Sequence, residues 1–429
     1  MSSWLFIVAF LVFLLIRVPM AFALGFSCVI YLLMNGMSLS VIPHIMITPF
    51  DSFPILAVPL FMLAGELMNI GGVSRRLFGF AKTLVGHIPG SLGHVNIVAS
   101  MIFAGMSGSA VADTAGLGAV EIHEMVREGF DPDFSAAVTA ASATVGPIIP
   151  PSIPFVLYGA TAGVSIGALF AGGAIPGLIM GLSMMPVVYV IARRRSYKVY
   201  PRATLKELAT ATKNAFLPLL TPAILLVGIL AGVVTPTEAA VLAVVYAIVL
   251  GKFIYNEYSF LGLIRIFLSV GQNVGGLVMI LTTASVFGWI LAYEGVPGLI
   301  AQALLGITNN KFVILIIFNF LFLLIGCFMD TITALLIMAP MVVPTIKGAG
   351  IDLVHFGVLL TLNLMIGLLT PPFGVCSFIV ANLAKISFER VIKAEIPFII
   401  ILIVVLLVIT FVPGIVTWLP SQLGYVPTR

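Results

Sequence analysis

The sequence predicts an all-helical protein that crosses a membrane many times and is built from two related halves. Three observations support this prediction: the composition is strongly apolar, the basic residues are clustered, and several motifs recur at a nearly constant spacing. Of the 429 residues, 61% are hydrophobic and only 8% are charged. Soluble domains carry about 25% charged residues, so the composition excludes a water-soluble fold.

A cluster of basic residues predicts how the chain is oriented. Seven of the 20 Lys and Arg residues lie between Arg193 and Lys213. Because cytoplasmic loops are rich in basic residues, we interpret residues 193–213 as a cytoplasmic linker. A nucleic-acid-binding patch is the alternative, but membrane spans flank the cluster on both sides, so no nucleic-acid partner is expected. At about 20 apolar residues per span, the chain has material for about ten to twelve spans.

The two halves, residues 1–192 and 214–429, share motifs at a shift of about 217 to 223 residues. The segment VGPIIPP of the first half aligns with IGLLTPP of the second. The loop at residues 161–165 carries no charge, whereas its counterpart at residues 385–393 carries three basic residues. These loops are expected on opposite sides of the membrane. The halves are therefore predicted to be inverted repeats, an arrangement common in secondary transporters.

Each half contains an apolar stretch interrupted by small and polar residues. In residues 93–120 the interruption reads GMSGSAVAD, and in residues 312–344 it reads GCFMD. Irregular backbone at membrane depth is tolerated only where protein or a water-filled cavity satisfies it. We therefore expect a re-entrant helical hairpin in each half, with the first tip at Ser107, Gly108 and Ser109. A close helix–helix contact through small residues is the alternative.

Asp113 and Asp330 stand at matched places in these interrupted stretches, with no basic residue in the apolar sequence around either one. A charge in a membrane span is costly, and such residues usually line ion or substrate pathways. Snorkelling or pairing within the helix bundle is one alternative. Another is an intramembrane aspartyl-type enzyme, but nothing in the sequence brings the two acids as close as a shared proton requires.

Two proline pairs predict broken helices, one in residues 134–160 and one in residues 355–383. Proline removes an amide donor and stops a helix, so the preceding carbonyl oxygens lose their intrahelical partners. Such oxygens can bind a desolvated monovalent cation. The predicted ligands are the carbonyls of Gly146 and Ile149 with the hydroxyls of Ser107 and Ser109, and in the second half Gly367 and Thr370 with the neighbourhood of Asp330. A simple proline kink is the alternative for each pair.

The broken helices also favour an anionic substrate. Helix N-termini at the hairpin tips and after the proline pairs would point their positive dipole ends toward the middle of the membrane. The first hairpin has no Lys or Arg that would pair with an anion there. The sequence contains neither HExxH nor GxxxxGK[ST], so a zinc protease and a self-contained ATPase are not expected. An ion channel stays an alternative, although paired broken helices suit an occluding carrier better.

Together, GMSGSAVAD, VGPIIPPS, GCFMD and TPPFG resemble the motifs of the large membrane subunit of tripartite ATP-independent periplasmic (TRAP) transporters, over essentially the whole chain. The resemblance implies a multi-pass protein of the bacterial inner membrane that imports small organic acids, such as sialic acid or C4-dicarboxylates, with sodium ions. It implies an elevator-type architecture, in which a transport domain carrying both hairpins moves against a scaffold. It also implies two partners, a small four-helix membrane subunit and a periplasmic substrate-binding protein.

The resemblance further implies which residues bind. Sodium ions are expected at Ser107, Ser109, Asp113, Gly146, Ile149, Pro151, Asp330, Gly367, Thr370 and Pro372. The substrate is expected between the hairpin tips, at Ser107, Gly108, Ser109, Asp330 and Thr331. No catalytic residue is expected, and Na+ is the bound ion that the resemblance implies.

Overall fold

The computed structural model of the chain describes residues 5–16 and 18–425; Arg17 and the outer ends of the two predicted repeats lie outside the described residues. Every regular element in the described part is helical. There, seven helices are long and apolar enough to cross a membrane, and seven further apolar helices have only 10–17 residues. The prediction of an all-helical, multi-span membrane protein is confirmed, and the short helices fit interrupted spans.

The first half contains the helices that precede the basic cluster, and the second half contains those that follow it. The first set is α1 (Leu5–Leu15), α2 (Met20–Met34), α3 (Val41–Ile47), η2 (Thr48–Asp51), η3 (Phe53–Leu56), α4 (Ala57–Ile70), α5 (Val73–Val85), α6 (Ser91–Ser107), α7 (Ala110–Ala115), α8 (Leu117–Arg127), α9 (Pro132–Ala143), α10 (Ile153–Ala162) and α11 (Ile166–Arg195). The second set is α12 (Leu205–Leu230), α13 (Pro236–Ile248), η4 (Val249–Ile254), α14 (Phe260–Tyr293), α15 (Val296–Ile307), α16 (Lys311–Gly326), α17 (Thr331–Gly348), α18 (Leu353–Gly367), α19 (Val375–Ala384), α20 (Phe388–Phe411) and α21 (Gly414–Gln422).

The connection between the halves is shorter than the predicted linker at residues 193–213. Helix α11 continues to Arg195 and α12 begins at Leu205, so only residues 196–204 lie outside helices. Helix α12 starts there because Thr204 and Glu207 form a capping box. The Glu207 N–H donates to Thr204 Oγ1 over 3.2 Å, and the Thr204 N–H donates to the Glu207 carboxylate over 2.7 Å. A strong local helix signal therefore outweighs the polar composition.

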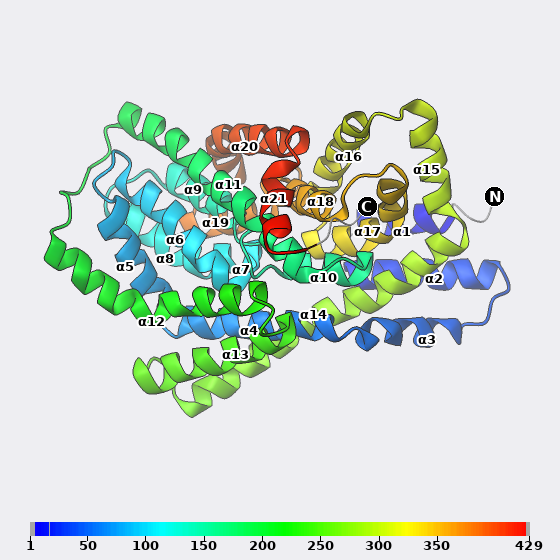
Figure 1. Cartoon of the computed structure of the whole chain (residues 1–429), viewed down its shortest axis with the longest axis horizontal. Helices are drawn as coiled ribbons and strands as arrows, with labels where there is room; N and C mark the ends of the chain where they lie inside the picture. The colour runs from blue at the N-terminus through cyan, green and yellow to red at the C-terminus, as the bar shows by residue number, and fades with distance from the viewer. Residues whose placement is uncertain (1–4, 17, 426–429) are drawn as a thin grey trace.

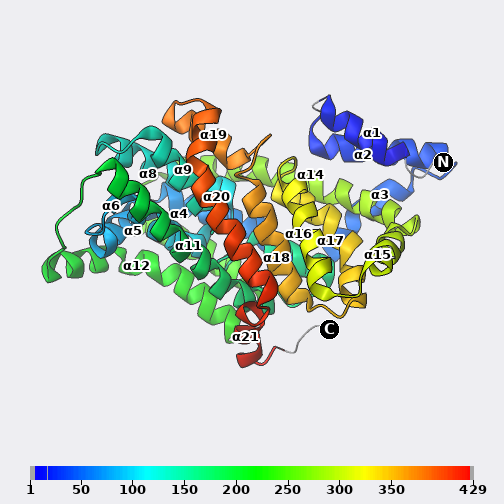
Figure 2. The same ribbon diagram turned by 90° about the horizontal axis from the view of Figure 1, so that it is seen from above.

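The helices form two groups (Figure 1). Helices α2–α4 and α12–α14 pack on one another and form a basal layer along the lower part of Figure 1. Helices α6–α11 and α16–α20 form a second group, the hairpin bundle, above it. Helix α5 packs on α6 and α12, and α15 packs on α17 and α14, so each of these two helices connects the groups. Figure 2 shows α20 crossing the hairpin bundle and α1 with α2 at one end of the molecule.

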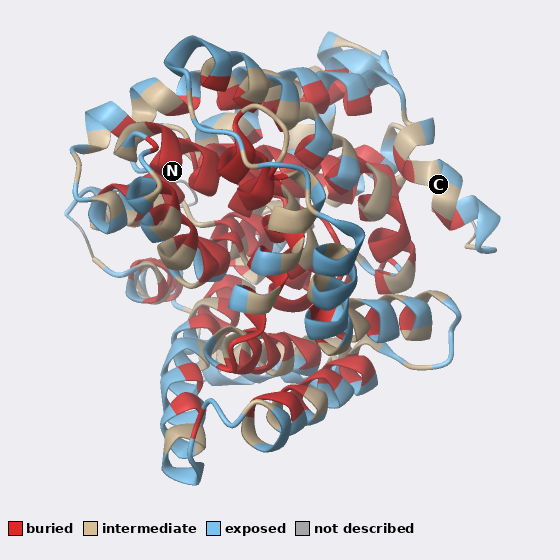
Figure 3. Ribbon diagram, turned by 90° about the vertical axis from the view of Figure 1, so that its left-hand side faces the viewer, coloured by how far each residue is buried: buried red, intermediate tan, exposed pale blue. Residues whose placement is uncertain are grey.

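The core of the protein lies in the hairpin bundle, where buried residues concentrate in Figure 3. Helix α18 is buried along its entire length, and α9 is buried from Phe134 to its end. A helix that is apolar on all sides is normally surrounded by other helices. The first segments of the two broken helices therefore lie at the centre of the molecule.

Asparagine side chains join the hairpin to the broken helix in each half. In the first half, Asn96 Nδ2 donates to Thr139 Oγ1 and Ser142 Oγ donates to Asn96 Oδ1, both over 2.7 Å. In the second half, Asn363 Nδ2 donates to Asn319 Oδ1 over 2.9 Å. Asn96 on α6 and Asn319 on α16 are separated by the shift that relates the two halves. The same interhelical link therefore occurs in both halves.

Candidate functional site

The first hairpin breaks at Ser107, Gly108 and Ser109. Gly108 adopts φ +61°, in the left-handed region that favours glycine. Ser109 caps α7, because the Ala112 N–H donates to Ser109 Oγ over 3.4 Å. A Cβ placed on Gly108 would lie 2.7 Å from the carbonyl oxygen of Pro151. The tip of the hairpin therefore meets the break between α9 and α10.

Asp113 lies on α7, just beyond this tip, and its side chain is buried, with 2% exposure. The Ser107 hydroxyl donates to Asp113 Oδ1. Within the described residues, Asp113 Oδ2 has no hydrogen-bond partner. A Cβ placed on Gly146 would lie 2.5 Å from Oδ2, so this oxygen faces the break after α9. A buried charge without a partner is costly, and a cation at this position would remove that cost.

The break between α9 and α10 supplies further oxygen atoms. Residues 144–152 lie between these two helices and are buried. No described residue donates a backbone hydrogen bond to the carbonyl oxygen of Gly146 or of Ile149, and proline has no N–H to donate. Carbonyl, hydroxyl and carboxylate oxygens around a dehydrated position are ligands that suit a hard monovalent cation. The residues of the first half thus fit a sodium ion.

The second hairpin breaks between Gly326 and Thr331, and Asp330 caps the helix that follows. Asp330 Oδ2 accepts the Thr333 N–H over 3.1 Å, and Asp330 Oδ1 accepts the Thr333 hydroxyl. Asp330 therefore occupies the capping position that Ser109 occupies in the first hairpin. The interpretation of Asp113 and Asp330 as matched acids is wrong. Counted from the cap, the counterpart of Asp113 is Ala334.

The second broken helix also differs from the first. The carbonyl oxygen of Gly367 accepts both the N–H and the hydroxyl of Thr370, each over 3.0 Å. Pro371 and Pro372 are exposed, whereas their counterparts in the first half are buried. A Cβ placed on Gly367 would lie 2.5 Å from the Cα of Gly326, so the second hairpin touches this break through backbone atoms. The oxygens predicted to bind an ion here already bond within the chain.

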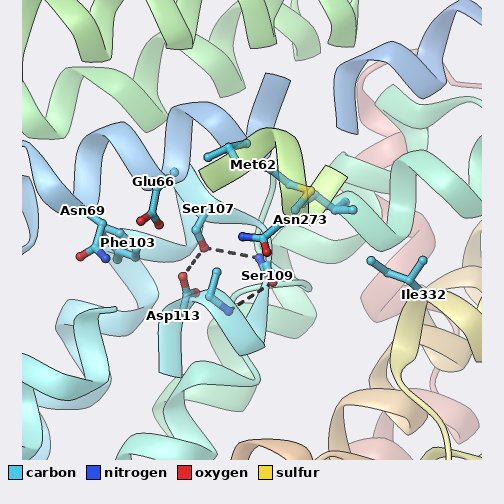
Figure 4. A pocket seen from close by; sticks show the side chains of 13 residues that line it. Met62, Glu66, Asn69, Phe103, Ser107, Ser109, Asp113, Asn273 and Ile332 are labelled. Carbon is cyan, nitrogen blue, oxygen red and sulfur yellow. Dashed lines mark hydrogen bonds between the residues drawn. The ribbon is translucent and has the colours of Figure 1, made fainter. Parts of the chain in front are cut away.

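Two adjoining cavities lie beside the hairpin tips. A cavity of about 490 Å³ is lined by both hairpins and α14, and Gly108, Ser109, Asp330 and Thr331 are among its lining residues. This volume lies within the range of small-molecule sites, about 300–1,000 Å³. Ser107, the fifth residue predicted to bind substrate, instead lines a smaller cavity of about 90 Å³ (Figure 4). The structure thus brings the two hairpin tips to one cavity.

Several polar residues near the tips were not predicted as site residues. Glu66 on α4 lines the smaller cavity and lies close to Ser107 and Asp113 in Figure 4. Gln272 and Asn273 on α14 line the larger cavity. Polar residues in otherwise apolar spans are the signal that would have identified all three. Their positions relative to the hairpins depend on how the basal layer packs.

Two further carboxylates, Glu121 on α8 and Glu395 on α20, are fully buried. In each, Oε1 has no hydrogen-bond partner in the described part of the chain. The second oxygen of Glu395 accepts the Ser377 hydroxyl over 2.7 Å. The buried polar groups of the hairpin bundle therefore extend beyond the residues predicted from the motifs.

This architecture is shared with a solved membrane transporter. The YdaH transporter of Alcanivorax borkumensis has a similar fold, with a TM-score of 0.61 and 16% sequence identity over 86% of this chain and 87% of that chain. Residues 7–415 match the family described as "Tripartite ATP-independent periplasmic transporter, DctM component". The chain belongs to this family and is a multi-pass protein of the bacterial inner membrane.

Three relatives agree with this assignment. The sialic acid TRAP transporter large permease protein SiaM of Vibrio cholerae is 42% identical over 95% of this chain and 96% of its own length. The isethionate TRAP transporter permease protein DctMQ of Oleidesulfovibrio alaskensis is 39% identical over 95% of this chain and 64% of its own length. The C4-dicarboxylate TRAP transporter large permease protein DctM of Pseudomonas aeruginosa is 36% identical over 87% of this chain and 88% of its own length. The predicted resemblance is confirmed, and the chain is a transporter permease rather than an enzyme.

Proposed function

We propose that this chain is the transport-catalysing membrane subunit of a sodium-coupled importer of a small organic acid, of the sialic acid or C4-dicarboxylate type. The observation that carries the proposal is the buried Asp113 carboxylate, whose Oδ2 lies against Gly146 without a hydrogen-bond partner among the described residues. A membrane-embedded acid held in this way usually belongs to an ion pathway. Sodium binding would convert an unfavourable buried charge into a neutral pair.

The first sodium site in this proposal lies where the hairpin tip meets the first broken helix. The Asp113 carboxylate and the Gly146 carbonyl are its central ligands, and the Ser107 hydroxyl already donates to Asp113. The surrounding residues of this site are Ser109, Ile149 and Pro151. All of these except Ser109 are buried, which favours binding of a dehydrated ion.

The second sodium site would use Asp330, Gly367, Thr370 and Pro372. In the conformation described, Thr370 donates to the Gly367 carbonyl, and Thr333 donates to both Asp330 oxygens. Sodium at this site would therefore share these oxygens with the Thr370 and Thr333 donors. The exposure of Pro371 and Pro372 supports a second site that is not fully enclosed in this conformation.

The substrate in this proposal lies in the larger cavity, between Gly108 and Ser109 of the first tip and Asp330 and Thr331 of the second, with Ser107 at the adjoining smaller cavity. Thr331 lines this cavity, and its buried Oγ1 has no hydrogen-bond partner among the residues described. The relatives are named for sialic acid, isethionate and C4-dicarboxylates, all of which are small organic acids. We propose the same general class of substrate for this chain.

We also propose that the two halves are inverted repeats and that the hairpin bundle moves as a transport domain against the basal layer. The repeated asparagine links and helix breaks support the repeat, and the opposite charge of matched loops supports the inversion. Cysteines introduced at Thr161 and Lys385 should react with a membrane-impermeant maleimide from opposite sides. Labelling of both from one side would contradict the inversion.

Two partners complete the proposed transporter: a small four-helix membrane subunit and a periplasmic substrate-binding protein. The family description names a tripartite periplasmic system. One relative has a name, DctMQ, that joins the letters M and Q. It is considerably longer than this chain, which covers 64% of its length. Genes for both partners are expected beside the gene for this chain.

Reconstitution of all three proteins in liposomes tests the proposed function. With binding protein and labelled organic acid outside, uptake against a concentration gradient should require an inward sodium gradient. The same uptake driven by a proton gradient without sodium would overturn the coupling. Single-channel currents from the membrane subunits in a planar bilayer would indicate a channel rather than a carrier.

A further inference from the structure

Gln272 and Asn273 are two adjacent carboxamides near the middle of α14, a 34-residue helix that is apolar enough to span the membrane. Both residues are exposed and line the larger cavity. Neither carboxamide bonds to another described residue. An amide without partners is costly in an apolar environment. Water or a ligand in the cavity must therefore satisfy these groups.

Both carboxamides lie at the cavity that the two hairpin tips line. Gln272 and Asn273 line the same cavity as Ser109, Asp330 and Thr331. Asn273 also lines the smaller cavity, and Figure 4 shows it beside Ser109. Helix α14 packs on α2, α3 and α4 of the basal layer as well as on α17. The cavity therefore receives hydrogen-bonding groups from a helix that belongs to neither hairpin.

The charge of the cavity limits which acids fit it. Among the described residues that line it, Asp330 is the only charged one, and none is Lys, Arg or His. A second carboxylate on a substrate would find no cationic side chain of this chain and would approach Asp330. A carboxamide, in contrast, donates and accepts hydrogen bonds and matches neutral hydroxyl and amide groups. These features favour an acid with one carboxylate and several neutral polar groups.

We infer that Gln272 and Asn273 are specificity-determining residues that hydrogen-bond neutral hydroxyl or amide groups of the transported acid, so that this chain selects polar monocarboxylates over dicarboxylates. The inference rests on the proposed function of the same cavity. It narrows that proposal to one class of acid and adds a contribution from the basal layer to substrate recognition.

Competitive uptake by the complete three-protein transporter in liposomes tests the inference. The labelled probe is sialic acid, which carries one carboxylate with hydroxyl and amide groups, and the competitor is succinate. Q272A and N273A should each raise the KM for sialic acid about tenfold, the effect of losing a neutral hydrogen bond. Neither variant should change kcat or the half-saturating sodium concentration appreciably. N273D should raise the KM further, because it keeps the size of the side chain but adds a negative charge.

Gln302 on α15 provides the matched control, because it is exposed and lines neither cavity. Q302A should transport sialic acid with the wild-type KM. Wild-type KM values for both Q272A and N273A would overturn the inference while leaving the proposed function intact. A wild-type preference for succinate over sialic acid would overturn the inferred substrate class. Failure of the wild type to carry any organic acid under a sodium gradient would overturn both.

A chemical protection measurement covers the case in which the alanine variants fail to fold. N273C is introduced into a chain whose native cysteines, Cys28, Cys327 and Cys376, have been replaced by serine. Sialic acid should slow the reaction of this cysteine with a small maleimide several-fold, whereas a cysteine at Gln302 should react at an unchanged rate. Equal reaction rates at position 273 with and without sialic acid would contradict contact between substrate and α14.

Discussion

The first and second hairpins have the same order of helices but different polar contacts at their tips. In the first, Asp113 accepts the Ser107 hydroxyl through one oxygen, and its other oxygen has no partner among the described residues. In the second, both oxygens of Asp330 accept hydrogen bonds from Thr333. The first acid therefore keeps one oxygen without a hydrogen-bond partner among the described residues, whereas the second acid stabilises the start of a helix.

The surroundings of the two tips differ in the same way. A Cβ on Gly65 of α4 would lie 3.1 Å from the Ser107 Cα, so the basal layer packs closely against the first tip. The second broken helix exposes Pro371, Pro372 and Phe373. Repeated backbone topology therefore does not imply equivalent sites. The tip of the first half is enclosed by the basal layer, and the break of the second half is partly exposed.

The largest expected effect concerns the two acids. Asp113→Asn removes the buried charge next to Gly146 and should raise the half-saturating sodium concentration about 100-fold, corresponding to ~2.7 kcal/mol. Asp330→Asn keeps a carbonyl acceptor for Thr333, so it should raise the half-saturating sodium concentration by less than about tenfold. Sodium-dependent uptake by the reconstituted transporter measures both values. Equal losses for the two variants would show that the hairpins bind sodium equivalently.

The next largest effect is expected where the second hairpin touches its broken helix through backbone atoms. Gly367→Ala places a Cβ 2.5 Å from the Gly326 Cα, and overpacking of this kind costs about 2 kcal/mol. Thermal unfolding in detergent should show a lower midpoint for this variant, and transport should fall with it. Gly348→Ala is the matched control, because no atom lies within 4 Å of the added carbon. An unchanged midpoint for Gly367→Ala would mean that the second hairpin does not rest on its broken helix.

The asparagine links should have smaller and similar effects in the two halves. Asn96→Ala removes the partner of Thr139 and Ser142, and Asn319→Ala removes the partner of Asn363 and Thr410. Interhelical hydrogen bonds in membrane proteins contribute about 1 kcal/mol, so each variant should lower the free energy of unfolding by about that amount.

Asn214→Ala, on an exposed position of α12, is the control for the asparagine variants and should leave the unfolding transition unchanged. A large effect in only one half would indicate that the two links are not equivalent. In that case the repeat would be limited to the order of the helices and would not extend to their packing.

Local chemistry explains what the sequence predicts well. The first hairpin breaks at Ser107, Gly108 and Ser109 because a glycine in the left-handed region ends α6 and a capping serine starts α7. The proline pairs lie between α9 and α10 and between α18 and α19, where proline cannot continue a helix. Such signals act within a few residues and need no knowledge of the tertiary structure.

Features that depend on register or packing were predicted poorly. Asp113 and Asp330 look equivalent in the sequence, but their distances from the helix caps differ, and this difference determines what each carboxylate contacts. Gln272 and Asn273 are visible as polar residues in an apolar span, but only the packing of α14 shows that they reach the cavity. The start of α12 could have been predicted from the capping box that Thr204 and Glu207 form. The basic residues around it favoured a linker instead.

The smallest expected effect lies outside the membrane spans, where the helices that follow the hairpins begin. Asp131 precedes α9, and the Tyr197 hydroxyl, together with Arg195, holds the pKa of Asp131 below its ordinary value. The matched Asp352 instead accepts the N–H groups of Val354 and His355 at the start of α18. An exposed ion pair contributes less than about 1 kcal/mol, so Arg195→Ala should lower the unfolding midpoint slightly.

The pH dependence of this small effect identifies its cause. A depressed carboxyl pKa stabilises the folded state above the unfolded value, about 3.9, and this stabilisation is lost as the pH falls through the folded pKa. The difference between wild type and Arg195→Ala should therefore be largest above about pH 5 and should disappear in more acidic solution. A difference between wild type and Arg195→Ala that persists at low pH would assign the role of Arg195 to packing rather than to its ion pair with Asp131.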